Sequence, residues 1–121
     1  MTKPKLLLVD DEEEFVDTLA ERLHLRGFQV LTATDGEGAL RLIEKELPQV
    51  VVLDVMMPGL GGLEVLQQIK TRTPRIPVIL LTGHGSTADG IEGMRLGAYD
   101  YLVKPINIDE LIKKMLEAVS T

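Results

Sequence analysis

Five polar side chains in this sequence share one placement, because each comes at the end of a short run of apolar residues. They are Asp10, Asp11, Asp54, Thr82 and Lys104. Runs of branched apolar residues predict strands that are buried on both faces. If these strands are parallel, their carboxyl ends meet at one edge of a sheet, where open α/β folds bind their ligands. We therefore expect the five side chains to lie together.

Side chains of these types suit phosphoryl transfer assisted by a divalent cation. Three carboxylates at one sheet edge repel one another unless a cation lies among them. All-oxygen ligands favour Mg²⁺, and the spacing of acids in a calcium EF-hand loop is absent from the sequence. The Thr82 hydroxyl and the Lys104 ammonium, which could also pair with Asp54, would bind phosphoryl oxygens while the Asp54 carboxylate attacks phosphorus. Each residue also has a structural interpretation, as a turn aspartate, a capping hydroxyl or a solvated lysine.

The elements that must position these residues alternate strictly between strands and helices. Apolar runs predict five strands, at residues 6–9, 28–32, 50–53, 78–81 and 100–103. Amphipathic spacing predicts a helix after each strand, and the acids at residues 10–14 favour the start of the first helix. The expected apolar stripes are Phe15, Leu19 and Leu23; Ala39, Leu40, Ile43 and Leu47; Leu63, Val65, Leu66 and Ile69; Ile91 and Met94; and Ile108, Leu111, Ile112, Met115, Leu116 and Val119.

The fourth helix, over about residues 86–96, is expected to be the weakest because it contains Gly90 and Gly93. Each interior glycine costs ~1 kcal/mol of helix stability relative to alanine. Packing through Ile91 and Met94 must then hold this helix on the sheet. We also expect residues 86–96 to be more mobile than the last helix, since elements that move in switching come from the less stable parts of a fold.

The alternation predicts an α/β fold, a doubly wound flavodoxin-like (βα)5 domain over residues 1–121. Short connections imply a five-stranded parallel sheet of order 2-1-3-4-5 with helices on both faces. The 121 residues contain no cysteine, which excludes disulfides and thiolate metal sites, and the net charge of −6 argues against direct nucleic-acid binding. The apolar run near the start is too short for a signal peptide or a membrane span, so a cytoplasmic location is expected.

Four motifs in order, LLLVDDEEEF, VVVLDVMMPGLGGLEVL, PVILLTGHG and GAYDYLVKPI, resemble the receiver domain of two-component response regulators over essentially the whole chain. The resemblance implies that Asp54 is the phospho-acceptor. It implies that Asp11, Asp54 and the main-chain carbonyl of Met56 bind Mg²⁺, with Mn²⁺ as a substitute, and that Asp10 assists through water. By the same resemblance, Thr82 and Lys104 contact phosphoryl oxygens, the bond from Lys104 to Pro105 is cis, and Tyr101 is a switch aromatic that responds to Thr82.

The resemblance also implies a regulatory role rather than that of a turnover enzyme. A sensor histidine kinase or phosphotransfer protein would supply the phosphoryl group. The fourth helix, the fifth strand and the last helix would then present a changed surface to an output domain or effector protein, or to a second copy of the chain in a homodimer. Met56 and His84 occupy positions that tune hydrolysis of the acyl phosphate. Gly61-Gly62 replaces the usual Asp-Gly, and Gly61 is expected to take over as helix cap.

Other functions on the same fold remain to be weighed. A Mg²⁺-dependent phosphohydrolase with an aspartyl-phosphate intermediate would use similar groups, but its usual Asp-x-Asp motif has Glu12 in the third position here. Against a flavin-binding or purely structural module on the same fold, the sequence has no phosphate-binding loop after the first strand, and the acids that stand there would repel a phosphate. A GTPase is excluded because the G-x-x-x-x-G-K motif is missing. Tyr101 also has a simpler interpretation as a half-buried strand tyrosine.

Overall fold

The computed structural model describes residues 3–83 and 87–120, in which five strands alternate with five helices. The strands are β1 (Lys5–Val9), β2 (Gln29–Ala33), β3 (Val50–Asp54), β4 (Val78–Thr82) and β5 (Asp100–Val103). The helices are α1 (Glu13–Leu25), α2 (Gly36–Glu46), α3 (Gly62–Arg72), α4 (Thr87–Arg95) and α5 (Ile108–Val119). This confirms the predicted alternation.

All strand pairs are parallel, and the order across the sheet is β2-β1-β3-β4-β5, as predicted. Every residue of β3 and β4 is buried, whereas the outer strands β2 and β5 are partly exposed. The unbroken apolar runs of β3 and β4 are explained by this burial, because central strands of a doubly covered sheet have no solvated face. The sheet therefore presents the end of β3, with Asp54, at the middle of its carboxyl edge.

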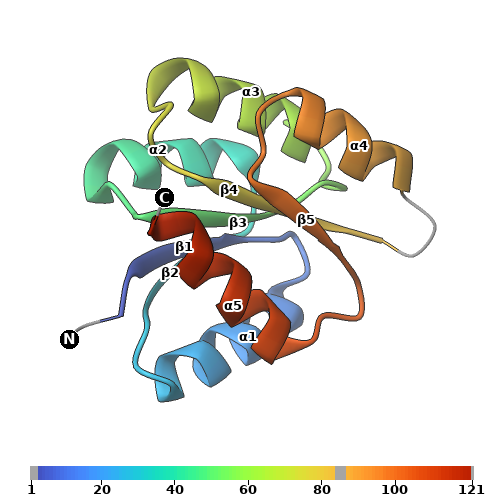
Figure 1. Cartoon of the computed structure of the whole chain (residues 1–121). Helices are drawn as coiled ribbons and strands as arrows, with labels where there is room; N and C mark the ends of the chain where they lie inside the picture. The colour runs from blue at the N-terminus through green and yellow to red at the C-terminus, as the bar shows by residue number, and fades with distance from the viewer. Residues whose placement is uncertain (1–2, 84–86, 121) are drawn as a thin grey trace.

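Two hydrophobic cores lie on opposite faces of the sheet, beneath the helices that Figure 1 shows. Helices α1 and α5 cover one face, and α2, α3 and α4 cover the other. Along β1, Leu7 and Val9 enter the core beneath α2 and α3, whereas Leu6 and Leu8 enter the core beneath α1 and α5. This is the alternation of side chains expected along a strand. In the part of the chain that is described, no helix is long and apolar enough to cross a membrane.

The structure corrects the packing expected for three helices. Leu47 is not part of the buried stripe of α2: it follows the helix at a left-handed C-cap and is 64% exposed. Leu116 on α5 is also exposed. Ile91 and Met94 on α4 are 61% and 42% exposed, so the expectation that they hold this helix on the sheet is wrong.

Helix α4 packs on the sheet through its two glycines. A Cβ at Gly90 would lie 2.6 Å from a ring carbon of Tyr101, and one at Gly93 would overlap the side chain of Leu80. Both glycines are buried. The missing side chains let the helix backbone approach β4 and β5 closely, which turns Ile91 and Met94 toward solvent.

Element boundaries differ from the expected ones by one or two residues. Strand β2 begins at Gln29, and Phe28 precedes it as a buried core residue. The strands β3 and β4 extend by one residue to include Asp54 and Thr82, because both residues still pair with the neighbouring strand. Helix α1 begins only at Glu13, so the aspartates before it belong to the preceding loop.

Candidate functional site

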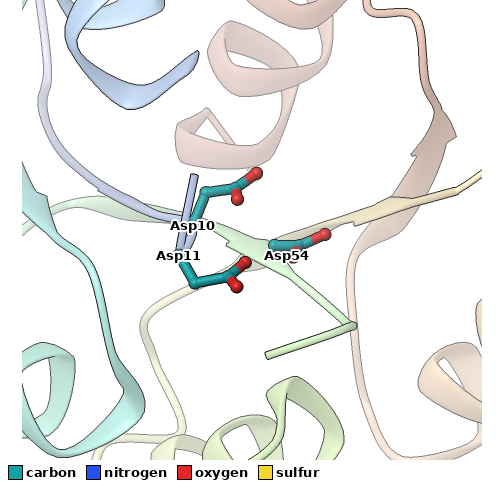
Figure 2. A group of neighbouring side chains, drawn as sticks. All are labelled: Asp10, Asp11 and Asp54. Atoms are coloured by element: carbon teal, nitrogen blue, oxygen red, sulfur yellow. The ribbon is translucent and has the colours of Figure 1, made fainter. Parts of the chain in front are cut away.

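Three aspartates converge at the carboxyl edge of the sheet (Figure 2). Asp10 and Asp11 follow β1, and Asp54 is the last residue of the adjacent strand β3. One carboxylate oxygen from each lies within 4.8 Å of the others. Asp10 and Asp54 are buried, whereas Asp11 is exposed to solvent. The site is thus an acidic cluster with one open side.

The ammonium of Lys104 contacts two of these carboxylates. Its Nζ donates a hydrogen bond to Asp10 Oδ2 at 2.7 Å and lies 3.5 Å from Asp54 Oδ1. The backbone N–H of Lys104 donates to the carbonyl of Thr82 at 2.8 Å, which holds the residue beside the end of β4. The sequence suggested Asp54 as the partner of Lys104, but the structure gives the shorter contact to Asp10.

Both carboxylate oxygens of Asp10 have partners within the chain. Oδ1 accepts the backbone N–H of Glu12 at 3.0 Å, and Oδ2 accepts the Lys104 ammonium. Asp54 has only the longer contact to Lys104. Among the described residues, no group donates a hydrogen bond to the side-chain oxygens of Asp11. Asp11 and Asp54 are therefore the carboxylates most available to an added cation.

The surroundings of Asp54 disfavour the ionised form of its carboxyl group. Burial and the nearby carboxylate of Asp10 together raise the pKa of Asp54 from 3.8 to about 6, against the opposing pull of Lys104. Burial lowers the pKa of Lys104, but the hydrogen bond to Asp10 and the attraction of Asp54 outweigh it, so the pKa lies above its ordinary value. At neutral pH the site therefore holds an ionised Asp54 beside a charged lysine, with excess negative charge.

The remaining expected site residues lie at the same edge or next to it. Thr82 is fully buried, and its hydroxyl donates a long hydrogen bond of 3.4 Å to the carbonyl of Leu102. The side chain of Met56 is 65% exposed just after Asp54. Tyr101 is half-buried on β5 against Gly90 of α4. The peptide bond between Lys104 and Pro105 is cis. His84 lies outside the described residues.

The loop after β3 returns close to the acceptor strand, and glycine makes this possible. The N–H of Gly62 donates to the carbonyl of Val55 at 3.1 Å, and a Cβ at residue 62 would overlap the carbonyl oxygen of Asp54. Gly61 is the N-cap of α3, as expected, and its N–H lies 3.4 Å from Glu64 Oε1. The Gly61-Gly62 pair thus starts α3 directly beside Asp54.

Sequence reasoning missed two neighbours of Lys104. Glu12 Oε1 lies 3.5 Å from the ammonium, and the centroid of the Phe15 ring lies 4.6 Å from it. The sequence interpretation assigned Glu12 to the start of a helix and Phe15 to its apolar stripe. No sequence signal pairs α1 with residue 104, which is about 90 positions away, because the contact arises only when α1 and β5 meet at the same edge.

Comparison with known proteins gives the family. Residues 6–116 match the model of the response regulator receiver domain. The chain is 49% identical over 110 residues to the probable transcriptional regulator ycf27 of Guillardia theta, covering 91% of this chain and 43% of that protein. It is 43% identical over 107 residues to the alkaline phosphatase synthesis transcriptional regulatory protein PhoP of Bacillus subtilis, covering 88% and 45%. The chain spans less than half the length of these curated relatives.

A solved structure agrees with this match. The receiver domain of NtrX from Brucella abortus superposes with a TM-score of 0.91 at 37% identity, covering 96% of this chain and 98% of that one. The fold, the sheet order and the acidic edge described above are thus accompanied by similarity over nearly the whole sequence. The chain belongs to the family of response regulator receiver domains.

Proposed function

We propose that this receiver domain accepts a phosphoryl group on Asp54 and acts as a phosphorylation switch. The observation that carries the proposal is the placement of a buried, ionisable Asp54 beside a lysine ammonium and two further carboxylates at the sheet edge. A carboxylate in this position can act as a nucleophile, and the neighbouring lysine ammonium can bind the oxygens of an incoming phosphoryl group.

In the proposed reaction, a carboxylate oxygen of Asp54 forms a bond to phosphorus. The bond from phosphorus to the donor breaks at the same centre, and the leaving atom, an imidazole nitrogen of a phosphohistidine, keeps the electron pair. Lys104 then binds one phosphoryl oxygen. The Thr82 hydroxyl binds another, since its bond of 3.4 Å to the Leu102 carbonyl is weak enough to be exchanged.

The donor set fits a magnesium ion. Asp11 and Asp54, with the main-chain carbonyl of Met56, would hold it, while Asp10 would act through a water because both of its oxygens are already bonded. Carboxylate and carbonyl oxygens are the ligands that Mg²⁺ and Mn²⁺ prefer. A bound Mg²⁺ would offset the excess negative charge of the site and of the phosphoryl oxygens.

The proposed signal passes from Thr82 to Tyr101 and to the surface made by α4, β5 and α5. Tyr101 is suited to this role because its ring lies against the backbone of α4 at Gly90. The surface carries exposed apolar side chains, namely Ile91, Met94, Val103 and Leu116. Movement of Tyr101 when Thr82 turns toward the phosphoryl group would shift α4 and change this surface for a partner.

We further propose the partners by analogy with the relatives. A sensor histidine kinase or phosphotransfer protein would phosphorylate the domain, and an output domain or effector protein would read its state, in some cases through a homodimer. The relatives named above are transcriptional regulators more than twice the length of the matched segment, which supports an output step in transcription.

The intact mass of the protein after incubation with acetyl phosphate tests the proposed chemistry. We expect one added phosphoryl group on the wild type in the presence of Mg²⁺, and none on Asp54→Asn or in EDTA. Asp17→Asn, which changes an exposed aspartate on α1, is the matched control and should be phosphorylated like the wild type. Absence of any adduct, combined with no binding of beryllofluoride to folded protein, would refute Asp54 as the acceptor.

A further inference from the structure

The ring of Phe15 is an uncharged group that contacts the Lys104 ammonium. Nζ lies 4.6 Å from the ring centroid, within the range of a cation–π contact. The other three neighbours are the carboxylates of Asp10, Glu12 and Asp54. Lys104 is thus held both by acids and by an aromatic ring.

Phe15 is itself well fixed. It lies in the first turns of α1, is half-buried, and packs against the core beneath α1 and α5. Lys104, by contrast, is the residue after β5, and its backbone N–H is hydrogen-bonded to the carbonyl of Thr82. A ring anchored in the core can therefore restrict the long lysine side chain, which otherwise has many rotamers.

We propose that Phe15 is a positioning residue that keeps the Lys104 ammonium within reach of a phosphoryl group on Asp54. This inference rests on the proposed function. Carboxylate partners hold the lysine by charge, and each must share or release it when phosphoryl oxygens arrive. The ring adds no negative charge beside Asp54 and can stay in contact with the ammonium while Lys104 changes its acidic partner, so it preorganises the cation for the reaction.

Glu12 is less suited to this task. Its contact with Lys104 is 3.5 Å long and its side chain is 70% exposed, so solvent weakens the attraction. Glu12→Gln therefore serves as a matched control that removes a partner of Lys104 and leaves the ring. Phe15→Leu keeps an apolar side chain against the core but removes the aromatic face, and Phe15→Tyr keeps the face.

Nuclear magnetic resonance of the lysine side chains tests the placement without any phosphorylation. The ring current of Phe15 should shift the ε-CH₂ signal of Lys104 upfield in the wild type and in Phe15→Tyr, but not in Phe15→Leu. Lys3 provides an internal control, since its Nζ lies 5.0 Å from the centroid of Phe28 and its signal should not respond to Phe15→Leu. The ε-CH₂ signal that disappears in Lys104→Arg is the one that belongs to Lys104.

The rate of phosphorylation by acetyl phosphate tests the consequence. Phe15→Leu should react about two- to fivefold more slowly than the wild type, the fold-change of a cation–π contact of ~0.5–1 kcal/mol, while its melting temperature falls by only about 2–5 °C. Phe15→Tyr should retain the wild-type rate, and Glu12→Gln should stay within about twofold of it.

Two results would overturn the proposal: a Lys104 signal that is not shifted upfield in the wild type, or a Phe15→Leu variant as fast as the wild type. A wild type that accepts no phosphoryl group at all would instead refute the proposed function. The resonance of Lys104 would still report in that case whether Phe15 holds the ammonium, so the two failures are distinguishable.

Discussion

Replacement of Asp54 by asparagine should stabilise the folded protein, and the gain should depend on pH. Burial and the Asp10 carboxylate raise the pKa of Asp54 from 3.8 to about 6, so the fold favours the neutral carboxyl. Stability from a raised pKa is fully present below the unfolded-state value and is lost as pH rises through the folded-state value. The wild type should therefore lose stability relative to Asp54→Asn between about pH 4 and about pH 6.

The expected size of the stability gain follows from the pKa shift of Asp54. A rise of about 2 pKa units corresponds to about 3 kcal/mol, because one unit is worth ~1.4 kcal/mol. Asp54 is 4% exposed, so solvent screening reduces this value little. Above pH 6, Asp54→Asn should be about 2–3 kcal/mol more stable than the wild type, which is a gain of roughly 10 °C in melting temperature for a domain of this size.

Urea unfolding followed by far-ultraviolet circular dichroism, in EDTA and at several pH values, measures this difference. The matched control is Asp17→Asn, which changes an exposed aspartate in α1 and should track the wild type at every pH. Added Mg²⁺ should stabilise the wild type more than Asp54→Asn and so reduce the gap, because an ion bound only by the folded state raises its stability.

A difference between Asp54→Asn and the wild type that stays constant from about pH 4 to about pH 8 would refute the reasoning. A destabilised Asp54→Asn above pH 6 would refute it more strongly. Either result would mean that the attraction of Lys104, at 3.5 Å, outweighs burial and the repulsion from Asp10.

Four further outcomes are expected from the structure. Gly62→Ala should cost about 3 kcal/mol of unfolding free energy in urea, because its Cβ would overlap the carbonyl oxygen of Asp54. Gly90→Ala should destabilise by about 1–2 kcal/mol despite the better helix propensity of alanine, and Tyr101→Leu in the same chain should recover most of this loss, since the ring is what the new methyl group meets. Lys104→Ala should keep the circular dichroism spectrum of the fold while its phosphorylation rate falls about tenfold or more. Amide hydrogens in Thr87–Arg95 should exchange about tenfold faster than those in Ile108–Val119, and equal protection would contradict the expected mobility of α4.

Most of the fold could be predicted because its determinants are local. Unbroken branched apolar runs at β3 and β4 indicate strands buried on both faces, and the alternation with amphipathic helices then leaves few topologies. The position of the site followed as well, since parallel strands end at the same edge. The N-cap at Asp35, whose side chain accepts the N–H of Gly38 at 2.6 Å, is another feature that a short stretch of sequence specifies.

The packing of α4 could not be predicted in this way. When α4 is considered apart from the rest of the fold, its glycines indicate only low helix propensity. In the folded chain they are the contact surface itself, because Leu80 and the ring of Tyr101 occupy the space of their missing side chains. Hydrophobic periodicity cannot show this, since it assumes that the buried face of a helix is its apolar one.

The sequence by itself determined which chemical groups reach the carboxyl edge of the sheet: Asp10, Asp11, Asp54, Thr82 and Lys104. Periodicity and the parallel topology are sufficient for that, because both depend on residue type and spacing. Only the tertiary structure decided which of these groups interact. Lys104 lies closer to Asp10, at 2.7 Å, than to Asp54, at 3.5 Å, and also contacts a ring from α1. The ranking of competing carboxylates depends on distances that differ by less than about 1 Å between segments far apart in the chain.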